Sequence, residues 1–343
     1  MSTAIRGSLR TERDASEHLS SAAMAAAETE LMRAVILREF GGPEVLAVER
    51  VPRPRPILTE VQVRVHAAGV NPVDFKTRIG RGMAPVIGEP PICVGWDVAG
   101  VVTAIAPGVT RFAVGDEVLG MPWFPRQAGA YAEYVTAPSR HFIGKPGALT
   151  TEEAGALPLA ALTAWQVVID TARVQDGDDV LIHGGAGGVG HFAVQIAKAR
   201  GAHVVATARR EQAEWLGSLG AERVIDYREE RFEDEVAELD AVIDCQGSSG
   251  EGSLPVLRPG GILVSVPSRV PPELLAQARE MNRRATGFLV EPDPVGLAGL
   301  TALIESGHLQ VEVGHVFDLE QAAGAHRLAE ESHGAGKIVL RVA

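Results

Sequence analysis

The hydrophobic positions between residues 32 and 150 follow the period of β-strands. In the stretch 60–69, Val61, Val63 and Val65 alternate with polar residues, which is typical of a strand with one buried face. Other short apolar runs are separated by turns that contain Pro and Gly, and no long helical period appears before about residue 150. This part of the chain is predicted to form a compact β-rich domain.

Strands and helices alternate in the part that follows. Thr150 and Glu153 have the spacing of a capping box, which predicts the start of a helix. The segment 189–201 has apolar residues at helical spacing and ends at Gly201, and continuously apolar strands precede and follow it. Repeated β-α-β units of this kind predict a parallel sheet with helices on both faces. The segment 336–342, GKIVLRV, is predicted as a lone strand that returns to the first domain.

Composition and charge limit the kinds of binding partner that are expected. The chain has 343 residues, a formal net charge of −12, 46% hydrophobic residues and 22% charged residues. The length predicts two domains or one large one. An acidic surface repels phosphate backbones and anionic lipid, so neither nucleic acid nor a membrane is expected as a partner. No apolar run has the length of a membrane span.

The cysteines and the N-terminal residues predict the compartment. Cys93 and Cys245 share no motif spacing, so neither a disulfide framework nor a four-ligand zinc site is expected. Both are interpreted as reduced thiols of a cytoplasmic protein. Residues 1–31 lack the charged start, the apolar stretch and the cleavage site of a signal peptide, and they are predicted to be a flexible N-terminal extension.

Glycines are dense in HGGAGGVG, residues 183–190. Three of them fit G-x-G-x-x-G between a buried strand and an amphipathic helix, which is the context that dinucleotide binding requires. The helix start would offer free N–H groups and a partial positive charge to a pyrophosphate. A tight turn without a ligand is the alternative, and the absence of G-K-[ST] disfavours a P-loop. The predicted contacts come from Gly185, Ala186, Gly187, Gly188, Val189 and Gly190.

The next strand predicts which dinucleotide binds. Sites for NAD place Asp or Glu at its end, whereas here Arg209 and Arg210 follow the strand 203–208. Two guanidinium groups suit the 2′-phosphate of NADP, so NADP(H) is the predicted cofactor. Glu211 could instead neutralise one arginine or bind a ribose, and solvation of both arginines at a helix start is the alternative.

Five stretches together resemble one family. The chain resembles the medium-chain dehydrogenase/reductase superfamily, and within it the zinc-independent quinone oxidoreductase (zeta-crystallin-like) branch, over about residues 32–343. The stretches are AAGVNPVDFKTR (67–78), GWDVAGVV (95–102), GAYAEYV (129–135), ALPLAALTAW (156–165) and HGGAGGVGHFAVQIAKARGA (183–202).

The resemblance implies an α/β fold with two domains and a homodimer. A GroES-like β-barrel domain would contain residues 32–153 and 287–343 and would bind the substrate. A Rossmann domain with a doubly wound parallel sheet, residues 154–286, would bind NADP. The strand GILVSV, residues 261–266, is expected at the sheet edge, where pairing with a second copy would hide that edge.

Zinc ligands of related dehydrogenases are replaced in this chain. Asn71 stands where those enzymes have a cysteine, and Trp96 and Asp97 stand where they have a His-Glu pair. An amide and an indole cannot replace a thiolate and an imidazole, so no metal is expected. Without a Lewis acid, alcohol oxidation is disfavoured, and NADPH-dependent reduction of a quinone or an α,β-unsaturated carbonyl compound is the predicted activity.

The resemblance also implies roles for single residues. Asn71 and Thr163 would lie near the nicotinamide or the substrate carbonyl, Tyr227 would flank the adenosine phosphate, and Phe288 in GFLV would pass the nicotinamide. The alternative roles are those of a turn amide for Asn71, a helix hydroxyl for Thr163 and a packing residue for Tyr227. Lys76 is a candidate proton donor, with solvent exposure of Lys76 and water as the donor as alternatives. Asp74 and Asp97 are expected to anchor loops, Tyr131 to be structural and His191 to pack.

Two other functions are consistent with this sequence. One is a tailoring enoyl reductase of a biosynthetic pathway, which shares the chemistry. The other is a non-catalytic NADPH-binding or redox-sensing protein. The physiological substrate is not named by any motif.

Overall fold

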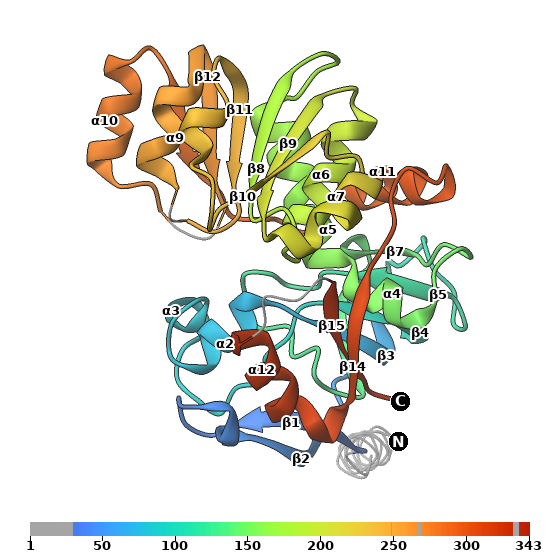
Figure 1. Ribbon diagram of the computed structural model, residues 1–343. Coiled ribbons are helices and arrows are strands. Elements are labelled where there is room, and N and C mark those ends of the chain that lie inside the picture. The colour runs from blue at the N-terminus through green and yellow to red at the C-terminus, as the bar shows by residue number, and fades with distance from the viewer. Residues whose placement is uncertain (1–29, 248, 267–268, 332–335) are drawn as a thin grey trace, which may run out of the picture.

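The computed structural model describes residues 30–247, 249–266, 269–331 and 336–343, which form two domains (Figure 1). The predicted N-terminal extension, residues 1–31, lies outside the described residues apart from its last two positions. Among the described residues, no helix is both long and apolar enough to cross a membrane.

The first domain is built mainly from antiparallel strands. One sheet has the order β14-β15-β3-β4-β5-β7 with β6 also paired to β3, and β1 and β2 form a separate pair. These strands are β1 (Leu31–Leu37), β2 (Leu46–Pro52), β3 (Glu60–Val70), β4 (Val98–Ile105), β5 (Glu117–Gly120), β6 (Tyr134–Pro138), β7 (Phe142–Gly144), β14 (Val313–Asp318) and β15 (Lys337–Arg341). The prediction of a β-rich first domain is confirmed.

Strand β3 lies in the middle of this sheet. Val61, Val63 and Val65 are fully buried, as their alternation predicts. The prediction that the polar residues between these valines are exposed is wrong for Gln62, which is also buried. Its side-chain oxygen accepts a hydrogen bond of 2.5 Å from Arg53, and its amide nitrogen donates one of 2.6 Å to the carbonyl of Pro54. These partners satisfy the amide, so its burial leaves no polar atom without a bond.

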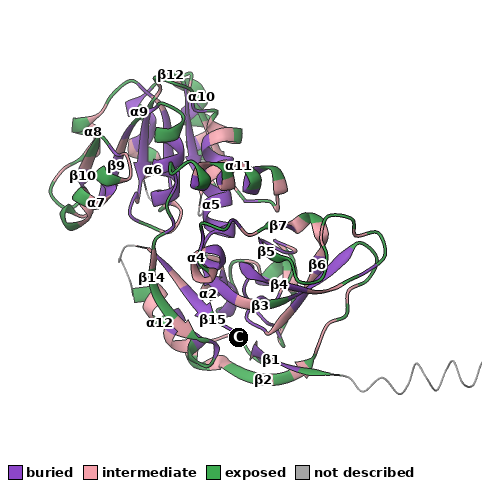
Figure 2. Cartoon of the chain, turned by 90° about the vertical axis from the view of Figure 1, so that its right-hand side faces the viewer, coloured by how far each residue is buried: buried purple, intermediate pink, exposed green. Residues whose placement is uncertain are grey.

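The second domain is a parallel sheet in the order β10-β9-β8-β11-β12-β13. Its strands are β8 (Asp179–His183), β9 (His203–Ala208), β10 (Arg223–Asp226), β11 (Leu239–Asp244), β12 (Leu257–Ser265) and β13 (Arg284–Gly287). Alternate residues of β8 belong to different cores. Val180 and Ile182 pack with helices α5 (Pro158–Trp165) and α6 (Gly190–Ala199). Leu181 packs with helices α9 (Gly250–Val256) and α10 (Pro272–Glu280). The predicted parallel sheet with helices on both faces is therefore confirmed (Figure 2).

The prediction that residues 261–266 form an edge of the sheet is wrong. Strand β12, which contains most of 261–266, pairs with β11 on one side and with β13 on the other. The edge is formed by β13, whose sequence RATG is short and has little apolar character. A strand of this composition gives no hydrophobic period, so the sequence pattern did not indicate it.

The helices follow the strands in both domains. Thr150 begins α4 with the predicted capping box: its hydroxyl accepts from the backbone N–H of Glu153 at 3.2 Å, and its own N–H donates to the Glu153 carboxylate at 2.7 Å. The helices are α2 (Pro72–Arg78), α3 (Ala84–Ile87), α4 (Thr151–Ala156), α5 (Pro158–Trp165), α6 (Gly190–Ala199), α7 (Ala213–Ser218), α8 (Phe232–Glu235), α9 (Gly250–Val256), α10 (Pro272–Glu280), α11 (Pro294–Glu305) and α12 (Ala322–Glu331).

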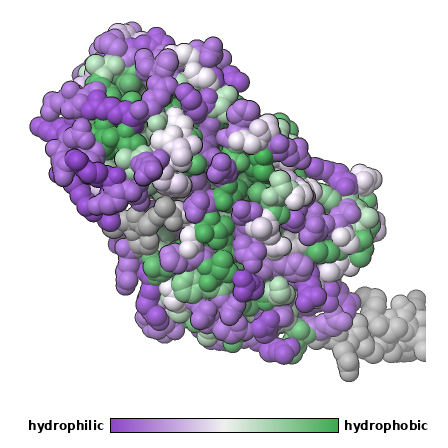
Figure 3. Space-filling model, turned by 45° about the vertical axis from the view of Figure 1, so that its right-hand side comes forward, coloured by the Kyte–Doolittle hydropathy of each residue, from purple (hydrophilic) through white to green (hydrophobic). Residues whose placement is uncertain are grey.

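The C-terminal strand joins the barrel next to the second domain. As predicted, β15 returns to the first domain, where it pairs antiparallel with β3 and places Ile338 opposite Val70. Helix α11 contacts both α5 and β7, so it touches both domains. On the face shown in Figure 3, apolar side chains gather in the middle, between the two domains.

Candidate active site

A pocket of about 320 Å³ lies between the two domains. The parallel-sheet domain contributes the glycine-rich loop after β8 and the residues that follow β9, β10 and β11. The barrel contributes the end of β3, the start of α2 and the start of β15. The carboxyl ends of the parallel strands thus face the barrel, which is the edge where doubly wound sheets bind ligands.

Two glycines of the loop are required by packing. A Cβ added at Gly190 would lie 2.2 Å from the carbonyl oxygen of Gly184, and one at Gly185 would lie 2.8 Å from the Cβ of Ala206 on β9. These glycines let the turn close against itself and against the neighbouring strand. Gly185 does not line the pocket, whereas Gly184 and the five residues 186–190 do.

The remaining loop residues present backbone donors to the pocket. The backbone N–H groups of Gly188, Val189 and Gly190 form no hydrogen bond with any described residue. They stand at the start of α6, where the helix dipole favours negative charge. Unpaired donors at a helix start form an anion site, and this arrangement fits a pyrophosphate.

The two arginines after β9 have different partners. Arg209 lines the pocket, and its Nε donates to the hydroxyl of Tyr227 at 3.2 Å. Arg210 does not line it, because its guanidinium pairs with Glu229 and lies 3.9 Å from Asp226. One guanidinium and one phenol therefore stand at this end of the pocket.

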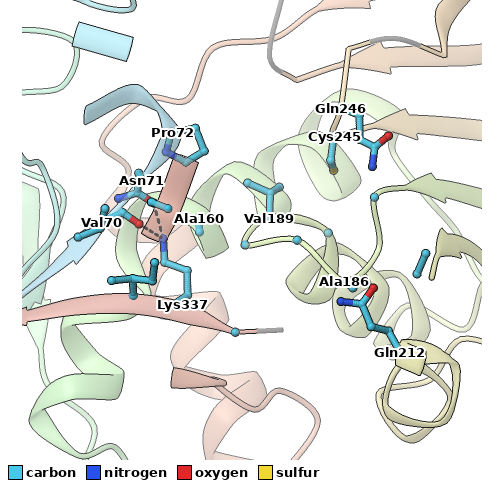
Figure 4. Close-up of a pocket in the computed structure, with 18 of the residues that line it drawn as sticks. Val70, Asn71, Pro72, Ala160, Ala186, Val189, Gln212, Cys245, Gln246 and Lys337 are labelled. Atoms are coloured by element: carbon cyan, nitrogen blue, oxygen red, sulfur yellow. Dashed lines mark hydrogen bonds between the residues drawn. The ribbon is translucent and has the colours of Figure 1, made fainter. Parts of the chain in front are cut away.

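Asn71 and Lys337 meet at the other end of the pocket (Figure 4). The Lys337 ammonium donates to the side-chain oxygen of Asn71 and to the carbonyl oxygen of Val70, the latter at 3.1 Å. The amide nitrogen of Asn71 donates to Asp97 at 2.7 Å. An acceptor-only carboxylate on one side and a donor-only ammonium on the other fix the orientation of the amide.

Asp97 and Asp74 anchor the segments around Asn71, as predicted. Asp97 also accepts from the backbone N–H of Leu159 at 2.6 Å, which ties the start of β4 to α5. Asp74 accepts from the backbone N–H of Asn71 at 2.7 Å and from the hydroxyl of Tyr131 at 2.9 Å. Burial raises the pKa of Asp74 to about 7 and that of Asp97 to about 6.

Comparison with known proteins identifies the family. Residues 58–147 match the alcohol dehydrogenase GroES-like domain, and residues 219–340 match the family described as zinc-binding dehydrogenase. A quinone oxidoreductase of Sus scrofa is 34% identical over 327 residues, covering 90% of this chain and 98% of the relative. The chain belongs to the quinone oxidoreductase branch of the medium-chain dehydrogenase/reductase superfamily. It is an oxidoreductase of that family.

Two further relatives agree with this quinone oxidoreductase assignment. The 2-methylene-furan-3-one reductase of Solanum lycopersicum is 33% identical over 338 residues, covering 94% of this chain and 84% of the relative. The solved quinone oxidoreductase of Coxiella burnetii has a TM-score of 0.85 at 37% identity, covering 92% of this chain and all of that one. The recognised family and the GroES-like and Rossmann domains predicted from the sequence are thereby confirmed.

The positions expected to hold zinc ligands in related dehydrogenases carry Asn71, Trp96 and Asp97 in this chain. Where those ligands are expected, Asn71 and Asp97 bond each other, and the indole nitrogen of Trp96 donates to the carbonyl of Arg126 at 2.6 Å. Within the described ranges, no group of three or more His, Cys, Asp or Glu residues is placed to hold a metal ion.

Besides Gly185 and Arg210, three more predicted site residues lie outside the pocket wall. Thr163 is buried in α5, and its hydroxyl donates to the carbonyl of Leu159 at 2.7 Å. Lys76 is half-buried on α2. Phe288 packs against the core of the parallel-sheet domain, and its backbone N–H donates to Ser265 at 2.9 Å. Direct roles for these residues stay predictions.

His191 packs, as predicted. Its Nδ1 bonds the carbonyl of Gly187 at 2.9 Å, and its ring lies against Phe192 and Trp215. Burial lowers its pKa to about 4, so the imidazole is neutral near pH 7.

Lys337 is a site residue that the sequence prediction missed. It opens β15 after Gly336, and its side chain is only 3% exposed. A lysine at the start of an apolar strand is a weak signal, because such side chains usually extend into solvent. Its contact with Asn71 joins positions 266 residues apart, which no local pattern reveals.

Proposed function

We propose that this chain is a zinc-independent, NADPH-dependent reductase that transfers hydride to a quinone or to an α,β-unsaturated carbonyl compound. The observation that carries the proposal is the set of unpaired N–H groups at residues 188–190, which lines the same pocket as the side chain of Lys337. In a chain with a net charge of −12, these donors and two cationic side chains make a local site for an anion.

NADP(H) is the proposed cofactor because of the side chains at the end of the pocket opposite to Lys337. The Arg209 guanidinium and the Tyr227 hydroxyl bond each other there and suit a 2′-phosphate. The 10-residue helix α6 begins at Gly190 in the wall of the pocket that Arg209 and Lys337 also line. A dinucleotide would thus extend from Arg209, over the loop, to Asn71. When bound, its nicotinamide supplies the hydride.

The substrate class follows from the relatives and from the chemistry of Asn71. The relatives' names specify a quinone and a 2-methylene-furan-3-one, and both compounds have electron-poor double bonds. Such substrates accept hydride without a Lewis acid, provided that the protein orients them and stabilises negative charge on oxygen. The buried amide of Asn71 and the ammonium of Lys337 are the polar groups available at this end of the pocket.

The experiment is a turnover assay. Purified protein, NADPH and either 9,10-phenanthrenequinone or a panel of enones are mixed, and the loss of reduced-nicotinamide absorbance is followed. Oxidation with at least one acceptor is expected, together with tighter binding of NADPH than of NADH. Tight NADPH binding without oxidation across the panel would instead support the redox-sensing alternative.

We also propose a homodimer that forms through β13. This strand is an edge of the six-stranded sheet, and an open edge pairs readily with a second copy. Leu289, two residues after the end of β13, is 55% exposed, so an apolar side chain follows this edge directly. Light scattering should give twice the chain mass of 36.2 kDa, and a monomer would contradict this proposal.

A further inference from the structure

Reduction of an alkene needs a proton as well as a hydride, and the proposed function does not specify its source. Titratable side chains that line the pocket within the described residues are Arg209, Tyr227, Cys245, His315 and Lys337. A proton donor must reach the reacting carbon and must release its proton readily. These two requirements separate the candidates.

Four of the candidates meet the requirements poorly. Arg209 and Tyr227 bond each other at the end of the pocket assigned to the 2′-phosphate, and a guanidinium does not release its proton. Burial raises the pKa of the Cys245 thiol to about 12, and Figure 4 shows Cys245 across the glycine loop from Asn71. His315 stands opposite Ile338 on the edge strand β14, one residue from Lys337, and is exposed to solvent rather than buried.

Lys337 meets both requirements. Its ammonium has three N–H groups, of which two bond Asn71 and Val70, and the third has no partner among the described residues. A Cβ added at Gly188 would lie 3.4 Å from the Cδ and 4.0 Å from the Nζ of Lys337, so the side chain crosses directly over the loop. This contact and the bond to Asn71 place the free N–H between the pyrophosphate site and the reacting end.

We propose that Lys337 is the proton donor of the reaction, held by Asn71 and Val70 so that its third N–H faces the substrate. This proposal rests on the proposed reduction of enones. Hydride addition to the β-carbon moves the alkene electron pair toward the carbonyl oxygen and gives an enolate. The enolate α-carbon takes a proton from the ammonium of Lys337, which gives the saturated ketone and a neutral amine. The amine regains its proton from water as the product leaves.

The charged groups around Lys337 are consistent with this role. Burial lowers its pKa, while the buried carboxylates of Asp97 and Asp74 oppose that shift. His191, on the helix after the loop, is neutral and adds no charge near pH 7. The amine is therefore a stronger acid than an exposed lysine, while the two carboxylates favour its protonated form before the reaction.

The test distinguishes proton donation by Lys337 from an effect of its positive charge. Lys337→Arg keeps the positive charge but removes a group that can release a proton, and Lys337→Ala leaves space for a small amine. For Lys337→Arg we expect NADPH affinity within about threefold of wild type, measured by nicotinamide fluorescence. Its kcat with an enone should fall about 100-fold, the lower range for a lost general acid. Addition of ethylamine to Lys337→Ala should restore part of the lost enone turnover.

A quinone acceptor provides the internal control. Hydride transfer to a quinone gives a hydroquinone anion whose oxygen takes a proton from water, so the loss of kcat in Lys337→Arg should be less than about tenfold. Lys198→Met, which removes an exposed lysine paired with Glu222, is the control variant. A second readout is labelling by an amine-reactive ester and mass spectrometry, in which NADPH should protect Lys337 but not Lys198.

The outcomes are distinguishable. If wild type oxidises NADPH with neither acceptor, the proposed function itself fails. If wild type is active and Lys337→Arg retains its enone kcat, or loses enone and quinone turnover equally, Lys337 is not the proton donor and the proposed function stands. Lack of protection of wild-type Lys337 by NADPH would also overturn the proposal, even if the variants do not fold.

Discussion

The Nε atom of Arg209 donates to the hydroxyl of Tyr227 across 3.2 Å, at the end of the pocket opposite to Lys337. The neighbouring Arg210 instead pairs with Glu229. Because adjacent arginines have these different partners, they should differ in their effect on cofactor choice.

Arg209→Ala should weaken NADPH binding about 10- to 100-fold and leave NADH binding nearly unchanged. A charge-assisted bond to a phosphate contributes about 1.5–3 kcal/mol, which corresponds to that range. Fluorescence titration with both dinucleotides measures the effect. Arg210→Ala is the matched control, and an equal loss in both variants would contradict the assignment of the 2′-phosphate to Arg209.

Two glycines of the loop should respond differently to alanine. Gly190→Ala would push a Cβ to 2.2 Å from the carbonyl oxygen of Gly184, so the turn must open at a cost of about 1–3 kcal/mol in unfolding free energy. Gly188→Ala makes only a 3.4 Å contact with Lys337, so we expect a stable protein with weakened NADPH binding. Urea unfolding and NADPH titration separate the two effects.

Gly217→Ala is the control for the loop variants. Outside its own helix and its chain neighbours, no atom of the described residues lies within 4 Å of a Cβ at this position, so stability should be retained or slightly increased. Unchanged NADPH affinity in Gly188→Ala would show that the backbone of this loop does not approach a pyrophosphate.

Asp97→Ala should lower the unfolding free energy by about 3 kcal/mol at pH 8. The substitution leaves the buried N–H of Leu159 and the amide of Asn71 without an acceptor, and each such group is costly. Asp97→Asn retains an oxygen for one of the two donors, so its loss should be smaller. Equal losses in the two variants, measured by urea unfolding, would contradict the assigned bonds.

His326→Gln should become stabilised relative to wild type as the pH falls. Burial, with a smaller effect of Arg78, lowers the pKa of His326 to about 3 from an ordinary 6.5. The unfolded chain therefore takes up a proton below pH 6.5 while the folded chain does not, so this residue reduces stability as the pH drops toward 3. Between pH 8 and pH 5, the difference between variant and wild type should shift by about 2 kcal/mol in favour of the variant.

Urea unfolding at several pH values measures this shift. His308→Gln, at an exposed position, is the control and should show a smaller pH-dependent difference. A constant difference between His326→Gln and wild type over this pH range would show that His326 titrates equally in both states.

Local patterns determined much of this protein. The alternation around Val63, the capping box at Thr150 and the glycine spacing of 183–190 each depend on fewer than about ten neighbouring residues, whose period and backbone chemistry the sequence displays directly. They predicted the β-rich domain, the parallel sheet and the loop that faces the pocket. The side chains at Asn71, Trp96 and Asp97 led to the expectation that no zinc binds, and this expectation stays a prediction.

Only the tertiary structure decided the remaining features. It placed Arg209 rather than Arg210 in the wall of the pocket, and β13 rather than β12 at the sheet edge. It also brought Lys337 into contact with Asn71, which is 266 positions away in the chain. These outcomes depend on which strands pair and which side chains find partners. Such contacts are long-range, and they form only when the whole chain packs, so no period or short motif encodes them.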